Sequence, residues 1–170
     1  MFMQALAESK ADTDRKVAEN EKSIIEMRKQ IGGITAANGA IAEEAMFNAL
    51  NKTKSFATIQ FDFIRRNVPI VSKDYQTLTE LDILMVNGDC VLIGEAKHKV
   101  VIDDVFELLN NKLTLVREYF PEFKNHKLYL GIGGMSFVPN AEKVAKENGI
   151  GIIKMASDIV DYDYENIKTF

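Results

Sequence analysis

Two short apolar segments separated by Asn87-Gly88 constrain the fold of this chain more than any other feature. Residues 80–86 and 90–96 are rich in aliphatic and β-branched side chains, which favour strands. Asn-Gly between two such runs is the strongest short-range signal for a β-hairpin with a two-residue turn. The sequence therefore predicts that these segments pair antiparallel around that turn.

Charged side chains interrupt the two apolar strands. The predicted register places Asp82 opposite Ile93 and Glu80 opposite Glu95, and it points four side chains to one face of the hairpin: Glu80, Asp82, Glu95 and Lys97. Carboxylates that face each other across a strand pair repel. Buried charges destabilise a fold unless they are paired or bind a metal. Three carboxylates beside one ammonium therefore predict a site for a divalent cation.

The rest of the chain predicts an α/β domain with a mixed sheet. The expected order is αβββαβαβ, with helices over 40–50, 102–120 and 139–148 and strands over 57–64, 80–86, 90–96, 127–132 and 150–155. A hairpin followed by helical crossovers predicts a mixed central sheet flanked by helices. Arg65-Arg66 is interpreted as a surface turn, with contact to DNA as the alternative.

The helix over 40–50 carries an acidic residue on its apolar side. Met46, Phe47 and Leu50 mark that side, and Glu43 shares it at helical spacing. Glu43 is therefore a candidate fourth carboxylate for the predicted site. In the next helix, Asn111 and Lys112 are expected on a solvated face, with an orientation toward the site as the alternative.

A long helix is predicted ahead of this domain and to end at Gly32-Gly33. Residues recur along it at steps of four and three, which is a heptad seam: Val17, Ile24 and Ile31 at one core position and Leu6, Asn20, Met27 and Ile34 at the other. Lys10, Thr13 and Asn20 are polar members of this seam, so its first half is weak. β-Branched residues at the first position favour two parallel strands. We therefore expect a helix or coiled coil over 1–35, a domain over 36–170, and a homodimer through residues 6–34. The alternatives are an amphipathic helix that packs on its own domain and a frayed leader.

Composition excludes several classes of protein. The 170 residues carry a formal net charge of -4 with a pI near 5.3, which argues against a protein that coats nucleic acid nonspecifically. Cys90 is the only cysteine, so no disulfide framework is possible. No apolar stretch approaches the roughly 20 residues of a membrane span, and the N-terminus is polar. We expect a cytoplasmic protein without a membrane partner.

The spacing of the charged residues resembles a known motif. Asp82, twelve intervening residues and then Glu95-Ala96-Lys97 resemble the motif of the PD-(D/E)XK nuclease superfamily, which includes restriction-endonuclease-like and Holliday-junction-resolvase-like enzymes. Gly39 followed by Glu43 looks like the first conserved element of that superfamily. The αβββαβαβ order over about 36–155 is similar to its core fold. The chain looks closest to prokaryotic members with an N-terminal coiled coil. Leu81 stands where the motif has proline, and no recognition domain is appended.

The resemblance implies a restriction-endonuclease-like core and a Mg²⁺- or Mn²⁺-dependent endonuclease that hydrolyses phosphodiester bonds of DNA. It implies that Asp82 and Glu95 ligate the metal together with the Ala96 carbonyl, and that Lys97 orients the attacking water or stabilises developing charge. Glu43 would hold a metal-bound water or a second ion, and Glu80 is a further candidate ligand. The alternative is a catalytically inactive copy of the fold that acts in binding or assembly, with Lys97 in a plain ion pair.

Overall fold

The structure is a computed structural model that describes the backbone of residues 2–156 and 159–170. Side chains are described for residue 10 and for residues 12–156 and 159–170, so Leu6 of the predicted seam lies outside the described side chains. The chain divides into two compact units, Met1–Asn38 and Gly39–Phe170. In the described part of the chain, no helix combines the length and the apolar character that a membrane crossing needs.

A single helix, α1 (Phe2–Thr53), accounts for the first unit and the start of the second. The predicted end at Gly32-Gly33 and the separate helix from residue 40 are therefore wrong. Glycine costs a helix about 1 kcal/mol relative to alanine but does not forbid helical geometry. The helix ends instead at Thr53, and the next residue, Lys54, adopts a left-handed φ of 50° and donates its backbone N–H to the Leu50 carbonyl.

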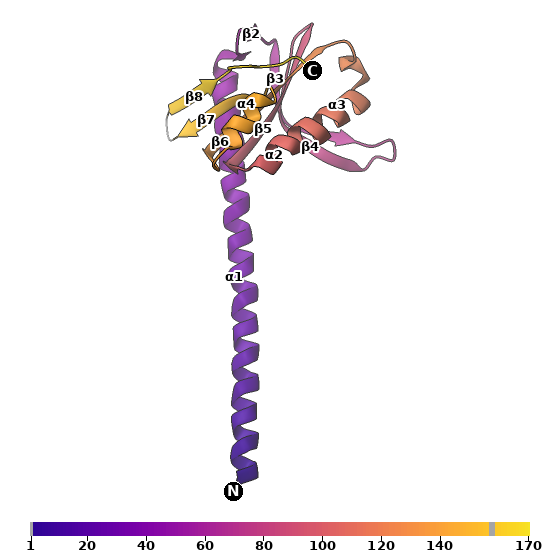
Figure 1. Ribbon diagram of the computed structural model, residues 1–170. Helices are drawn as coiled ribbons and strands as arrows, with labels where there is room; N and C mark the ends of the chain where they lie inside the picture. The colour runs from indigo at the N-terminus through magenta and orange to yellow at the C-terminus, as the bar shows by residue number, and fades with distance from the viewer. Residues whose placement is uncertain (1, 157–158) are drawn as a thin grey trace. The chain divides into compact units, whose positions relative to one another are not determined.

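The second unit is built on a six-stranded mixed sheet, which confirms the predicted α/β class. The strands are β3 (Phe63–Val71), β4 (Thr77–Val86), β5 (Cys90–Val100), β6 (Lys127–Phe137), β7 (Gly151–Ala156) and β8 (Ile159–Asp163), and they lie in that order. The pairs β3–β4, β4–β5 and β7–β8 are antiparallel, whereas β5–β6 and β6–β7 are parallel. Figure 1 shows the β3–β4 hairpin extending beyond the rest of the sheet.

Helices cover both faces of this sheet. One face packs on the C-terminal part of α1, where Ala42, Met46 and Leu50 are fully buried. The other face packs on α2 (Ile102–Phe106), the π-helical segment η1 (Glu107–Lys112), α3 (Leu113–Tyr119) and α4 (Ala141–Glu147). Figure 1 shows α2, α3 and α4 together on that side. A short 3₁₀ segment, η2 (Pro121–Phe123), follows α3.

Several predictions about the strands need correction. The predicted strand 57–64 is not continuous: it covers β2 (Ile59–Gln60), which pairs with β1 (Ser55–Phe56) in a small separate hairpin, and the first two residues of β3. Ala57 turns the chain within this hairpin with a φ of 53°. The long strand begins only at Phe63, so Arg65-Arg66 lies within β3 and is not a surface turn. Strand β8 was not predicted, and β6 continues through Gly133-Gly134 to residue 137.

The β4–β5 hairpin forms, but its register differs from the prediction by two residues. Val86 pairs with Val91 and Ile83 with Gly94, so the turn is centred on Gly88-Asp89. A type I′ turn needs positive φ at both central residues, and neither Asn87 nor Gly88 has it. The Asn87 side chain instead accepts hydrogen bonds from the Asp89 and Cys90 N–H groups, at 2.9 and 2.7 Å. A shift of two preserves which face each side chain occupies but changes its partner.

The faces of β4 switch at Asp82. Leu81 packs in the cluster beneath α2 and α3, whereas Ile83 packs in the cluster against α1. Two residues apart on a regular strand share one face. The switch coincides with an irregularity in β3, where Asn67 stands opposite Asp82 with a φ of 54° and interrupts the pairing. Asp82 therefore sits where the strand pair twists.

Candidate active site

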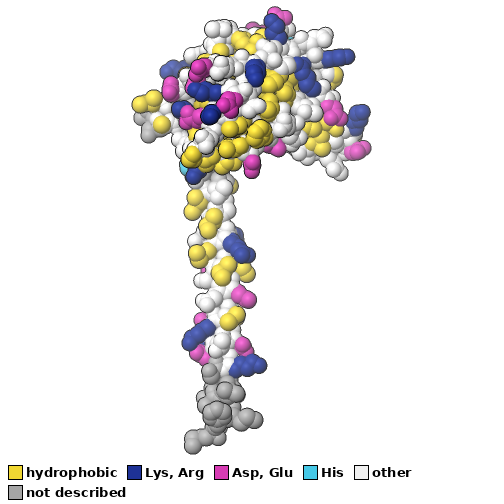
Figure 2. All heavy atoms as spheres, viewed as in Figure 1, with side chains coloured by type: hydrophobic (Ala, Val, Ile, Leu, Met, Phe, Trp, Pro, Cys, Tyr) yellow, Lys and Arg dark blue, Asp and Glu magenta, His cyan; other side chains and the backbone are white. Residues whose placement is uncertain are grey.

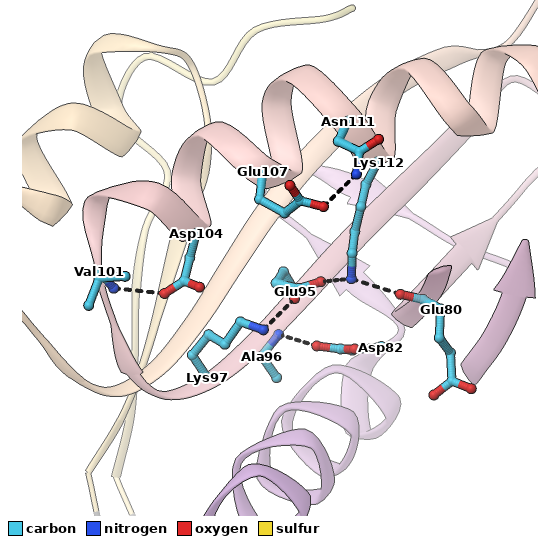
Figure 3. Close-up of polar contacts among 10 residues, drawn as sticks. All are labelled: Glu80, Asp82, Glu95, Ala96, Lys97, Val101, Asp104, Glu107, Asn111 and Lys112. Atoms are coloured by element: carbon cyan, nitrogen blue, oxygen red, sulfur yellow. Dashed lines mark hydrogen bonds and ion pairs between the residues drawn. The ribbon is translucent and has the colours of Figure 1, made fainter. Parts of the chain in front are cut away.

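The candidate site lies where β4 and β5 stop pairing. Their ladder ends at Ile83 and Gly94, although both strands continue with their outer neighbours. Beyond that point side chains take the place of ladder partners (Figure 3). The Ala96 N–H donates to Asp82 Oδ2 at 2.8 Å, and the Glu80 carbonyl accepts from Lys112 Nζ at 2.7 Å. The opened ladder thus gathers charged groups inside the sheet.

Glu95 is a buried carboxylate held between two ammonium groups. Only 3% of Glu95 is exposed, and its Oε1 lies 2.8 Å from Lys97 Nζ while its Oε2 contacts Lys112 Nζ. Figure 3 shows the two lysines approaching Glu95 from different elements, β5 and η1. A buried carboxylate without such partners would cost several kcal/mol. The predicted placement of Glu95 and Lys97 on one face agrees with this ion pair.

Lys112 does not lie where the sequence predicts. It was expected on a solvated helix face, yet only 5% of it is exposed. It belongs to the buried stripe formed with Val105, Leu108 and Val116, so its spacing was a usable signal. It also ends the π-helical turn η1, and such turns recur at functional sites. Asn111, in contrast, is exposed and bonds to Glu107.

The electrostatics of Asp82 are unfavourable for its charged form. Burial and then the negative charge of Glu95 raise the pKa of Asp82 from 3.8 to about 6, against the opposing effects of the Ala96 N–H and Lys112. Glu43 adds a smaller repulsion. The crowding of negative charge around Asp82 is the kind that a bound cation would relieve.

Lys97 is held in its charged form. Burial alone would lower its pKa, but the ion pair and hydrogen bond with Glu95 outweigh burial, and the pKa of Lys97 is raised above 10.5. The charges of Asp82 and Asp104 act in the same direction. At neutral pH Lys97 is therefore a cation that can stabilise negative charge, and it is not a general base.

The two remaining predicted carboxylates differ in where they lie. Glu43 is half-buried on α1 and close enough for its charge to act on Asp82. Glu80 is exposed, and Figure 3 shows its carboxylate directed away from the cluster, so it contributes only its backbone carbonyl. Ala96 meets Asp82 through its N–H. The structure thus brings Asp82, Glu95 and Lys97 together and leaves the Glu80 carboxylate out.

The donor set suits Mg²⁺ without forming a complete cage. Among the described residues, no three His, Cys, Asp or Glu side chains lie close enough together to hold a metal ion. Mg²⁺ is commonly bound by only one or two carboxylates, with waters and substrate phosphate completing its shell. Asp82 and Glu95 supply two repelling carboxylates, and Asp82 Oδ1 is not used by the Ala96 N–H. These residues fit a site that is completed by substrate.

Comparison with known proteins assigns the chain to one family. The family described as a domain of unknown function, DUF8196, matches residues 58–162, which is more than half of the chain. The chain belongs to this family. The matched region contains Asp82, Glu95, Lys97 and Lys112, whereas Glu43 precedes it. No curated protein and no solved structure shows significant similarity to the chain.

Proposed function

We propose that this DUF8196 protein is a Mg²⁺-dependent endonuclease that hydrolyses phosphodiester bonds of DNA. The observation that carries the proposal is the pair Asp82 and Glu95 in the opened β4–β5 ladder, where burial and then the charge of Glu95 raise the pKa of Asp82. This repulsion does not stabilise the fold, and carboxyl groups whose pKa is raised in this way cluster at functional sites. The spacing of Asp82 with Glu95-Ala96-Lys97 resembles the PD-(D/E)XK motif and supports the same reaction.

Asp82 and Glu95 would hold the metal, with the Ala96 carbonyl and Glu43 as further oxygen donors. When bound, Mg²⁺ would polarise the scissile phosphate and lower the pKa of a coordinated water. Lys97 would stabilise the charge that develops on the phosphate, because it stays protonated. Lys112 would keep Glu95 in place from the buried side, since its ammonium binds both Glu95 and the Glu80 carbonyl. Mn²⁺ would serve as a substitute with the same oxygen ligands.

The direct test is incubation with plasmid, single-stranded, branched DNA and RNA, each with Mg²⁺, with Mn²⁺ and with EDTA. Lys97→Ala and Asp82→Ala should lower the cleavage rate by about 100-fold or more, the cost typical of losing one electrostatic stabiliser. Lys99→Ala, two residues along the same strand and exposed, is the matched control and should cleave like the intact chain. Cleavage that persists in both site variants, or that EDTA leaves unchanged, would refute the assignment.

A second role, assembly, is favoured by the first unit itself. Its helix exposes apolar residues along the heptad seam, with exposed fractions of 48–61%: Val17, Ile24, Met27, Ile31 and Ile34. Figure 2 shows apolar side chains following one another along this helix. Because α1 continues through Gly32-Gly33, the seam keeps its register up to Ile34. We propose that two copies pair in parallel through residues 6–34, which also suits a binding module without catalysis.

Two neighbouring isoleucines test this pairing. Ile24 lies on the seam and Ile25 lies beside it. Both are exposed in the single chain, at 48% and 64%. In a two-stranded coiled coil only the core position is buried. Ile24→Asp should therefore give a monomer by light scattering, whereas Ile25→Asp should remain a dimer. Equal masses for the two variants, or an unchanged mass after removal of residues 1–34, would end the coiled-coil proposal.

A further inference from the structure

The edge strand β3 and the residues that follow it are locally basic. Residues 63–73 contain three cations, Arg65, Arg66 and Lys73, and no acidic residue. Both arginines are exposed, and neither forms an ion pair with any residue that the structure describes. Each guanidinium instead lies over an aromatic ring: Arg65 at 5.5 Å from the centre of Phe63, and Arg66 at 5.3 Å from the centre of Phe47.

The two arginines lie on opposite faces of the sheet. Arg66 pairs with Ile83, which packs in the cluster against α1, and Arg65 pairs with Leu84, which packs in the cluster beneath α2 and α3. Paired residues on adjacent strands point to the same side. The contact between Arg66 and Phe47 of α1 agrees with this placement. Two adjacent, exposed arginines therefore face different surroundings.

Arg66 faces the side of the sheet where the candidate site meets α1. Its partner Ile83 directly follows Asp82. The Arg66 guanidinium lies over the ring of Phe47, which is one helical turn from Glu43. The charge of Glu43 in turn acts on Asp82. Contact with the ring favours one position of the arginine side chain without neutralising its charge. Among the residues that the structure describes, Arg66 thus has no ion-pair partner, and it lies next to Asp82 in sheet register, on the face that packs on α1.

We infer that Arg66, held over Phe47, binds a non-scissile phosphate of the nucleic-acid strand that the Asp82–Glu95 site cleaves. The inference rests on the proposed nuclease function and adds to it a residue that binds substrate. A guanidinium matches a phosphate through two parallel hydrogen bonds, which an ammonium cannot provide. A lone exposed arginine holds a free anion weakly. When the same strand is also held at the carboxylate site, the second contact becomes intramolecular and is much stronger.

The test is binding of a fluorescein-labelled oligonucleotide to the full chain, measured by anisotropy in Mg²⁺ with the Lys97→Met substitution present throughout to prevent cleavage. Adding Arg66→Ala should raise Kd about tenfold and reduce the slope of log Kd against log salt by about 0.7–0.9, the contribution of one phosphate contact. Adding Arg65→Ala is the matched control, and its Kd should stay within about twofold. Phe47→Leu should weaken binding less than Arg66→Ala does, because it removes only the supporting ring.

Other outcomes overturn the inference. Equal effects of the two arginine substitutions would mean that the nucleic acid does not bind Arg66 in preference to Arg65. An unchanged Kd for Arg66→Ala would mean that Arg66 does not contact the nucleic acid. Inorganic phosphate or a mononucleotide that displaces the oligonucleotide at comparable concentration would identify a free-anion site in place of a strand contact. Failure of the intact chain to cleave, with Arg66-dependent binding preserved, would refute the nuclease function while leaving the phosphate contact in place.

Discussion

Replacing Asp82 with asparagine should make the protein more stable at alkaline pH. The carboxyl of Asp82 has a folded-state pKa of about 6, against 3.8 in the unfolded chain, chiefly because it is buried and then because Glu95 repels it. Asparagine has nearly the same shape, and its side-chain oxygen can still accept the hydrogen bond from the Ala96 N–H. The substitution therefore removes the charge while keeping the contact.

The size and sign of the effect follow from linkage. A carboxyl whose pKa is raised by folding costs nothing well below pH 3.8, where it is protonated in both states. The cost grows between pH 4 and 6 and is complete above the folded-state pKa. Each pH unit between the two pKa values corresponds to about 1.4 kcal/mol, so the ionised Asp82 destabilises the fold by about 2–3 kcal/mol at pH 8. Asp82→Asn should recover about that amount at pH 8 and almost nothing at pH 4.

Urea denaturation of the two proteins at pH 4 and pH 8 measures this difference. Asp89→Asn is a suitable control, because Asp89 is exposed in the β4–β5 turn and its change should stay within about 0.5 kcal/mol at both pH values. Added Mg²⁺ should raise the stability of the intact chain at pH 8 and leave Asp82→Asn unaffected, since a ligand stabilises only the state that binds it. A destabilised Asp82→Asn protein at pH 8, or a gain that does not depend on pH, would refute the reasoning.

Three further substitutions test the packing. Lys112→Met should lower the free energy of unfolding by about 3 kcal/mol in urea titrations, because it leaves buried polar groups without their partner, whereas Lys97→Met, at a side chain 39% exposed, should cost only about 1 kcal/mol; equal losses would contradict the burial of Lys112. Gly33→Ala should stabilise α1 by about 0.5–1 kcal/mol, seen as helical circular dichroism that persists to higher temperature, since an added Cβ meets nothing within 4 Å; a loss of helicity would argue for a break there. Gly151→Ala should lower the free energy of unfolding by about 1–3 kcal/mol, because its Cβ would lie 2.5 Å from the Phe56 ring; Phe56→Leu in the same chain should reduce that loss, and a loss of the same size would contradict the clash.

The strands that carry the site were predictable because their apolar runs are short and bounded by turn residues. Residues 80–86 and 90–96 fall within β4 and β5, and the helix over 102–120 ends before Pro121 as expected. The exact register was not predictable, because the side chain of Asn87 caps its own turn and moves the centre by one residue. The shift of two by itself keeps each side chain on its face, but the change of face at Asp82 directs the Glu80 carboxylate away from the cluster.

Other features depend on tertiary contacts that no local pattern contains. Gly32-Gly33 weakens the helix but does not end it, and α1 continues to residue 53. The twist at Asp82 arises from the left-handed conformation of Asn67 on the neighbouring strand. The burial of Lys112 could be predicted, because it is a charged residue on an apolar helix stripe. Its carboxylate partner, Glu95, could not, because it lies seventeen residues away in sequence. Sequence patterns located Asp82, Glu95 and Lys97, and only the second lysine that pairs with Glu95, Lys112, depended on packing.

The rate of plasmid nicking as a function of Mg²⁺ concentration, in the intact chain and in Lys97→Met, tests the central claim most directly. The claim is that Asp82, Glu95 and Lys97 form a metal-dependent site for phosphodiester hydrolysis. It predicts a rate that rises with Mg²⁺ to a plateau in the intact chain and falls by about 100-fold or more in Lys97→Met. Equal rates in the two proteins, or no nicking by the intact chain at any Mg²⁺ concentration, would contradict it.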